Sequence, residues 1–216
     1  MVTCVQLSDV GAVTALRLLR RPVGGVSGLR YSETLTAAPL SAHLLPRPTP
    51  GRVGLLSVWD DNAALDRFLT DHPIATTLEG GYRVRLRPTR VFGTWKAMGD
   101  IEARQAADDA PVAVLTLGRL LPSRAVAFLR ASAAAERDAL ASPALLLASG
   151  LARPPQLVAT FSLWRSAQPM RDYATQVGGG HLAATRQHAQ HPFHSESAFI
   201  RYQPYDISGH WHPPGC

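Results

Sequence analysis

Histidine is the residue type in this chain whose placement most points to chemistry. Six of the eight histidines fall in the last 36 residues: His181, His188, His191, His194, His210 and His212. A neutral imidazole can ligate a metal ion or a haem iron, and it exchanges protons near neutral pH. The stretch 178–193, in which three glycines precede His181, is therefore the first candidate for a chemical site.

A bare metal ion such as zinc is the first interpretation of these histidines. His181 and His188 are seven residues apart, so on a helix their side chains would be separated by about 10 Å, too far to share one ion. His188, His191 and His194 have a spacing of three, but Pro192 would interrupt a helix that carried them. The spacing does not favour this interpretation.

Haem is the second interpretation, because its iron needs one imidazole and an apolar pocket. His181 is the best candidate, since the glycine run frees the backbone before it and small alanines at 183 and 184 leave space for a flat ring system. The residues expected to line the pocket are Leu182, Phe161, Trp164, Phe193 and Phe199. Arg186 and Arg201 could pair with the propionates.

A third interpretation is that these are surface or helix-capping histidines, and composition alone favours it. The chain contains no GxSxG, no P-loop and no GxGxxG after a strand. Residues 178–180 follow a predicted helix, so they are more typical of a hinge than of a phosphate site.

Composition describes an ordinary globular protein, with 46% hydrophobic and 18% charged residues among 216. No apolar run approaches the roughly 20 residues of a membrane helix. Residues 1–5 carry no export signal, so we expect a cytoplasmic protein. Cys4 and Cys216 form no CxxC pair and are interpreted as two unrelated thiols.

The formal net charge of +6 comes almost entirely from arginine, and Lys96 is the only lysine. These arginines are scattered and interleaved with acidic residues, so the pattern does not indicate a nucleic-acid partner. It is consistent with attraction to an anionic substrate or to the carboxylates of a cofactor.

The hydrophobic pattern predicts the same order of elements, β-α-β-β-α-β, in each half of the chain. In the first half the predicted strands are 2–9, 29–37, 52–59 and 82–90, with helices within 10–21 and from Asn62 onward. In the second half the predicted strands are 111–117, 145–152, 156–164 and 197–205, with helices 122–140 and 168–177. The loop 39–50, which contains His43, is expected to act as a lid or rim.

Local matches indicate that the two halves are repeats. Residues 2–21 align with 112–131 at an offset of 110, 55–59 with 160–164 at 105, and 85–95 with 201–211 at 116. Trp59 and Trp95 are 36 residues apart, whereas Trp164 and Trp211 are 47 apart. The extra 11 residues must therefore lie in the histidine-bearing stretch, and Trp95 and Trp211 are expected to pack at the repeat ends.

We therefore predict an α+β protein in which two ferredoxin-like β-α-β-β-α-β repeats form a dimeric-α/β-barrel-type module. The predicted domains are a first repeat at 1–98, a linker at 99–110, a second repeat at 111–212 and a tail at 213–216. Each repeat has to cover the second face of its sheet, and pairing the two sheets achieves this. A ligand cavity would lie between sheet and helices or inside the barrel.

The second half resembles the spheroidene monooxygenase family of carotenoid ketolases. The resemblance is carried by the segment Phe161-Ser162-Leu163-Trp164, by His181-x-x-Ala184-x-x-x-His188, and by Pro192-Phe193-x-x-Glu196 followed by Phe199-x-Arg201-Tyr202. The first half agrees more loosely, through 18–21 and 28–31. Pro192-Phe193 departs from the family's doubly aromatic pair, so the resemblance does not imply a carotenoid substrate.

The resemblance implies a haem (iron protoporphyrin) enzyme on a duplicated scaffold similar to chlorite dismutases and aldoxime dehydratases, with His181 as the metal ligand. The leading hypothesis is a haem-dependent oxidoreductase, a monooxygenase acting on an apolar or natural-product-like small molecule. It would need an electron donor, and it could form a homo-oligomer. The alternatives are a haem enzyme of aldoxime-dehydratase type and a cofactor-free barrel that binds a small ligand or a partner.

Overall fold

The computed structural model describes the chain except for residues 44–48, 106–108, 156 and 212–216. The predicted tail at 213–216, together with His212 and Cys216, therefore lies outside the described residues. Within the described part, no helix is long and apolar enough to cross a membrane.

Each half of the chain follows the predicted order of elements. The first half contains β1 (Val2–Asp9), α1 (Ala12–Arg20), β2 (Leu29–Ala38), β3 (Arg52–Trp59), α2 (Asn62–Asp71), α3 (Pro73–Thr77) and β4 (Tyr82–Gly93). A short 3-10 helix, η1 (Lys96–Met98), follows it. The second half contains β5 (Val112–Leu120), η2 (Pro122–Arg124), α4 (Ala125–Leu140), β6 (Leu145–Arg153), β7 (Leu157–Trp164), α5 (Ala167–Thr175), α6 (Gly180–Gln190) and β8 (His194–Ser208).

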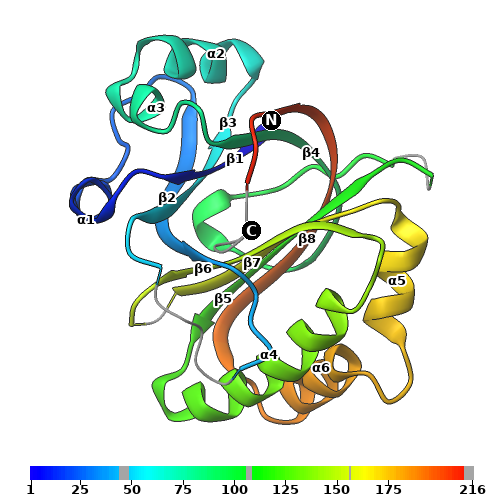
Figure 1. Cartoon of the computed structure of the whole chain (residues 1–216). Coiled ribbons are helices and arrows are strands. Elements are labelled where there is room, and N and C mark those ends of the chain that lie inside the picture. Colours follow the sequence, from blue (N-terminus) through cyan, green and yellow to red (C-terminus); the bar gives the residue numbers. More distant parts are fainter. Residues whose placement is uncertain (44–48, 106–108, 156, 212–216) are drawn as a thin grey trace.

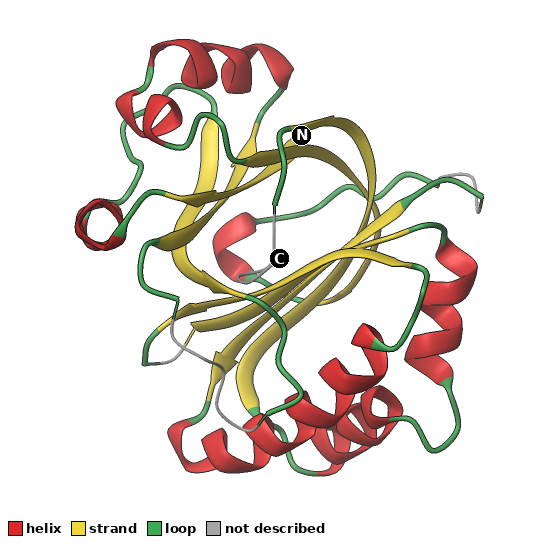
Figure 2. Cartoon of the chain, in the orientation of Figure 1, coloured by secondary structure: helices red, strands yellow, loops and turns green. Residues whose placement is uncertain are grey.

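The eight strands form one closed barrel in the order β1-β3-β2-β6-β7-β5-β8-β4, and neighbouring strands run antiparallel. Each half supplies four consecutive strands, and the seams between the halves are the pairs β2–β6 and β4–β8. The helices lie outside, with α1 to α3 on one side and α4 to α6 on the other (Figures 1 and 2). The predicted fold class is confirmed.

The barrel interior is a packed apolar core rather than a ligand chamber. Inward-facing residues of both halves, including Leu56, Leu115, Phe161 and Tyr202, form one buried cluster. Trp95 is buried in this cluster and Trp211 packs against it, as expected for residues at the repeat ends. A binding site is therefore better placed between the sheet and the outer helices.

One side-chain contact occurs in both repeats and supports their common origin. The indole Nε1 of Trp59 donates a hydrogen bond to the Ser57 hydroxyl over 2.9 Å. Trp164 and Ser162, which align with them at the offset of 105, form the same bond over 2.9 Å. Both tryptophans are buried on the outer face of the barrel, each against the helices of its own half.

The structure corrects several predicted boundaries and adds elements. The closing strand β8 begins at His194 rather than 197, because its first residues pair with the end of β5, and it runs to Ser208 rather than 205, because its last residues pair with the start of β4. The predicted helix 122–140 begins as the 3-10 turn η2. The short helix α3 was not predicted, because its five residues carry no helical period.

Candidate functional site

The helices of the two halves cover their sheets to different extents. Gln6 lies on the outer face of the central strand β1 and is only 3% exposed. Its aligned counterpart on β5, at the offset of 110, is Thr116, which is exposed. Leu55 on β3 is buried, whereas its counterpart Thr160 on β7 is half-buried. The outer layer of the second half therefore leaves the centre of its sheet accessible.

The burial of helix residues also shows that the second half is less completely covered than the first. In the first half, α2 buries Ala64, Leu65 and Phe68. In the second half, α4 buries only Ala133 and Ala139 over 16 residues, and none of the residues of α6 is buried. The apolar layer beneath α4 and α6 is therefore incompletely filled, which is the condition for a ligand to fit between helix and sheet.

Cross-strand register defines the outward-facing residues of this surface, here called the open face, and all of them are at least partly exposed except Val114, which is buried. Two rows run across β4, β8, β5, β7 and β6, the first being Phe92, Phe199, Thr116, Thr160 and Gly150, and the second Arg90, Arg201, Val114, Ser162 and Ala148. The side toward β6 and β7 carries small side chains. The side toward β4 carries two aromatic rings and two guanidinium groups.

A stack of three rings lies close to the Trp164 end of β7. Trp164 stacks on Tyr173 of α5 with ring centroids 5.1 Å apart, and Tyr173 contacts the His181 ring at 5.0 Å. The Tyr173 hydroxyl donates to the carbonyl oxygen of Ala135 over 3.1 Å, which ties α5 to α4. His181, at the start of α6, is thereby connected to the buried tryptophan through Tyr173.

The His181 imidazole is oriented by a backbone carbonyl. Its Nδ1 lies 3.2 Å from the carbonyl oxygen of Ala174. A carbonyl oxygen only accepts, so Nδ1 carries the proton and Nε2 keeps its lone pair. Burial lowers the pKa of His181, and the hydrogen bond to Ala174 opposes that effect. A neutral imidazole held through Nδ1 is the form that ligates a metal through Nε2.

The N-terminus of α6 is fixed against α4. The Gly180 N–H donates to the Asp138 carboxylate over 2.6 Å. A Cβ atom on Gly180 would lie 2.6 Å from the backbone carbon of Ala134, so only glycine allows the two helices to approach this closely. The glycine run, predicted to be a hinge, therefore ends in a packed contact. The helix α6 lies between α5 and β8, within the stretch that contains the length difference between the repeats.

A second imidazole cluster lies at the other end of α6. The Phe193 N–H donates to Nδ1 of His188 over 3.0 Å, and the rings of His188 and His194 are 5.2 Å apart. Phe128 of α4 packs edge-on against His194 at 5.1 Å. Burial, with a smaller contribution from His188, lowers the pKa of His194 to about 4. Among the described residues, no group of three or more histidine, cysteine or acidic side chains is arranged to hold a metal ion.

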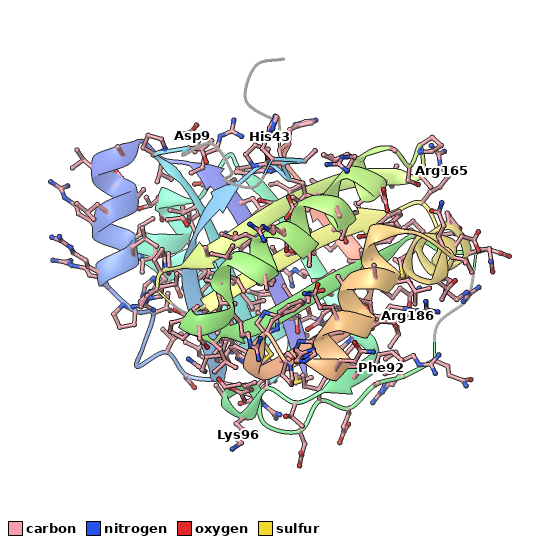
Figure 3. All side chains as sticks on the ribbon, turned by 90° about the horizontal axis from the view of Figure 1, so that it is seen from below. Asp9, His43, Phe92, Lys96, Arg165 and Arg186 are labelled. Atoms are coloured by element: carbon pink, nitrogen blue, oxygen red, sulfur yellow. The ribbon has the colours of Figure 1, made fainter. Side chains whose placement is uncertain are left out.

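The structure places the six predicted site residues in four locations. His181 and Trp164 meet through Tyr173, while Phe199 and Arg201 belong to the open face. Phe193 is buried in the second imidazole cluster. Arg186 is exposed on α6 (Figure 3), about 140° around the helix from His181 at 100° per residue.

The sequence did not single out Tyr173, Phe128, Phe92 or Arg90. Tyr173 and Phe128 lie on predicted helices, but their partners come from other elements. Phe92 and Arg90 belong to the first repeat and reach the second only through the β4–β8 register. No local spacing signals such contacts.

A groove of about 540 Å³ lies between α4 and α5 and is separate from the open face. Its lining residues are Asp138, Ala141, Ser142, Pro169, Asp172, Tyr173, Thr175 and Gln176. The carboxylates of Asp138 and Asp172 make it unsuitable for the propionates of a haem, because like charges repel.

Two known proteins are similar to this chain over most of its length. The chain is 34% identical over 196 residues to spheroidene monooxygenase from Rubrivivax gelatinosus, covering 88% of this chain and 74% of that protein. It is 26% identical over 172 residues to spheroidene monooxygenase from Cereibacter sphaeroides, covering 77% of this chain and 53% of that protein. No family model matches the chain.

A solved structure shares the fold at low sequence identity. A crystal structure of the aldoxime dehydratase OxdRE with butyraldoxime aligns with a TM-score of 0.55 and 12% identity, covering 95% of this chain and 79% of that chain. A ferredoxin-fold protein from Listeria monocytogenes related to antibiotic biosynthesis monooxygenases aligns with a TM-score of 0.36 and 14% identity, covering 94% of this chain and 95% of that chain. The identity and coverage of the Rubrivivax gelatinosus relative show that this chain belongs to the spheroidene monooxygenase family and is an oxidative enzyme.

Proposed function

We propose that this protein is a haem-dependent monooxygenase in which His181 ligates the iron and the open face holds the haem and an apolar small-molecule substrate. The observation that carries the proposal is the anchoring of His181 Nδ1 to the Ala174 carbonyl oxygen at 3.2 Å, on a helix of the outer layer of the second half. An oriented, neutral imidazole with a free Nε2 lone pair meets the requirement of a haem ligand.

The residues of the open face fit the rest of a haem. Small side chains such as Thr160, Gly150 and Ala148 leave a flat surface, and Val114 supplies apolar contact. Arg90 and Arg201 are directly opposite each other across β4 and β8. Two guanidinium groups in that position give this part of the surface a positive potential, which would attract an anionic carboxylate. Arg201 and Arg90 would therefore hold the propionates, with exposed Arg186 at the solvent edge.

When bound, the haem supplies oxygen activation, while the chain sets its ligand, surroundings and access. The Ala174 carbonyl fixes the His181 ring, and the Tyr173 and Trp164 rings exclude water from its side. Phe193 would close the far end of the apolar layer, and Phe199 would contact the bound group or the substrate. A small-molecule substrate and an external electron donor follow from monooxygenation.

Haemin titration followed by oxygen measurement tests this function. The purified protein should bind about one haemin per chain and develop a Soret band. After reduction, loss of an apolar substrate should be coupled to oxygen uptake. A protein that stays colourless with excess haemin would rule the proposal out.

Two further functions predicted from the sequence are distinguished by the same measurements. A haem enzyme of aldoxime-dehydratase type would turn over in the ferrous state without oxygen consumption. A cofactor-free barrel would take up no haemin, and His181→Ala would change its free energy of unfolding by at most about 1–2 kcal/mol without changing ligand affinity.

A further inference from the structure

One edge of the open face is made by the first repeat. The strand β4 pairs with β1 only through residues 82–86 and continues to Gly93 beside β8. In this continuation Val91 packs against the barrel interior, so its neighbours Arg90 and Phe92 point to the outside. Phe92 is therefore a first-repeat residue on the surface of the second.

The internal repeat provides a matched comparison for this edge. Phe92 pairs with Phe199 across β4 and β8. At the offset of 116 that relates these strands, Phe92 corresponds to Ser208 and Phe199 to Arg83, and Ser208 and Arg83 also pair with each other. The β4–β8 pairing therefore has two equivalent ends, and the aromatic pair occupies the one beside the open face.

The rings of Phe92 and Phe199 form a partly exposed aromatic pair. Their centroids are 6.0 Å apart with an interplanar angle of 59°, and the Arg90 guanidinium lies 4.9 Å from the Phe92 ring centroid. Phe92 is 48% exposed, although a phenylalanine ring is among the most costly groups to leave in water. On its other side, Phe199 pairs with Thr116, the exposed residue at the centre of the open face.

We propose that Phe92 is a substrate-binding residue which, with Phe199, forms the edge over which the flat, unsaturated part of an apolar substrate enters the open face. This assignment rests on the proposed function, because it assumes that the open face is the active site. Aromatic rings at 6.0 Å offer stacking and edge contacts to a planar apolar chain. Small side chains beyond them leave room for it.

Binding of diphenylhexatriene, an apolar conjugated probe whose fluorescence rises on leaving water, tests the assignment without haem. Phe92→Ala should weaken probe binding about threefold to tenfold, the range expected for one aromatic contact. Phe92→Trp should retain it. The control is Ile207→Ala, because Ile207 is also 48% exposed but lies at the other end of the β4–β8 pairing, away from the open face. This control should bind the probe as the unchanged protein does.

Haemin uptake by the same variants separates this assignment from the proposed function. Phe92→Ala should bind haemin as the unchanged protein does. If the protein binds the probe through Phe92 but takes up no haemin, the proposed cofactor is wrong and the assignment of Phe92 stands. Equal probe affinity in Phe92→Ala and Ile207→Ala would overturn the assignment. A lower molecular mass of Phe92→Ala in light scattering, with unchanged probe affinity, would also overturn it, since Phe92 would then contact a second copy of the chain.

Discussion

His194 combines burial with a missing hydrogen bond. Its Nε2 is buried and has no partner within the described part of the chain, and its ring lies where a Cβ atom of Gly118 would be, 2.5 Å from Nε2. Burial in this apolar position, with the neighbouring His188, lowers the pKa to about 4. The imidazole is therefore neutral in the folded protein at pH values where it is protonated in the unfolded chain.

This difference predicts a pH dependence of stability. The unfolded chain binds the proton with a pKa near 6.5, so between pH 6.5 and 4 it binds more protons at this site than the folded protein does. The free energy of unfolding should fall by about 1–2 kcal/mol as pH decreases through this window, less than the full pKa difference corresponds to, because solvent reaches the partly exposed ring. Urea titrations should show a shallower fall in His194→Gln. Parallel pH profiles for the two proteins would show that His194 does not contribute.

At the residue scale, the sequence predicted which histidine to examine but not what surrounds it. The choice of His181 depended on the glycine run, the 11-residue difference between repeats and the family resemblance. Tyr173, which contacts the His181 ring, and Asp138, which accepts from Gly180, come from α5 and α4. These contacts depend on how helices pack, and no sequence spacing encodes that packing.

The helix α6 is the element that distinguishes the second repeat, and Gly180 sets its position. Because a Cβ at Gly180 would lie 2.6 Å from the Ala134 backbone, Gly180→Ala must push α6 away from α4. We expect a loss of about 1–3 kcal/mol in the free energy of unfolding, as for other overpacked sites. Thermal or urea unfolding measures this loss. Gly24→Ala is the control, since a Cβ atom at Gly24 would have no other atom within 4 Å.

The same variant reports on the site. If α6 moves, His181 should lose its bond to the Ala174 carbonyl, and haemin affinity should fall along with stability. Unchanged stability and unchanged haemin binding in Gly180→Ala would contradict the proposed role of this contact.

Periodicity predicted most elements well, and its failures have physical causes. The predicted strands 2–9 and 52–59 coincide with β1 and β3. The helix predicted within 10–21 is confirmed as α1. Two of its apolar residues, Val13 and Leu16, are nevertheless 66% and 49% exposed, because α1 packs through Ala15 and Leu18 instead. Periodicity identifies a helix without identifying which neighbour it will contact.

At the scale of the whole molecule, closure of the barrel couples the two repeats. Phe161 is fully buried in a core that contains residues of both halves. Phe161→Ala should therefore lower the free energy of unfolding by about 3–5 kcal/mol. Far-ultraviolet circular dichroism and tryptophan fluorescence should still report one shared transition. Separate transitions for the two signals would show that the halves unfold independently.

The repeat, the closed barrel and the family could all be predicted from the sequence. Residues at fixed offsets indicate the repeat and hence the barrel, and short motifs in the second half indicate the family. The open face could not be predicted. It arises because equivalent positions of the two repeats carry different residues, such as Gln6 and Thr116, or Leu55 and Thr160. The effect of these differences depends on which faces of the strands lie under helices. The contribution of Phe92 also depends on how far β4 extends beside β8.

The central claim is that His181 ligates a haem on the open face, and the absorption spectrum after haemin reconstitution tests it most directly. The unchanged protein should show a Soret band with one haemin per chain, and His181→Ala should lose or shift that band. His191→Ala should keep it, because His191 is exposed beyond the end of α6. Identical spectra for the His181→Ala and His191→Ala proteins would contradict the account.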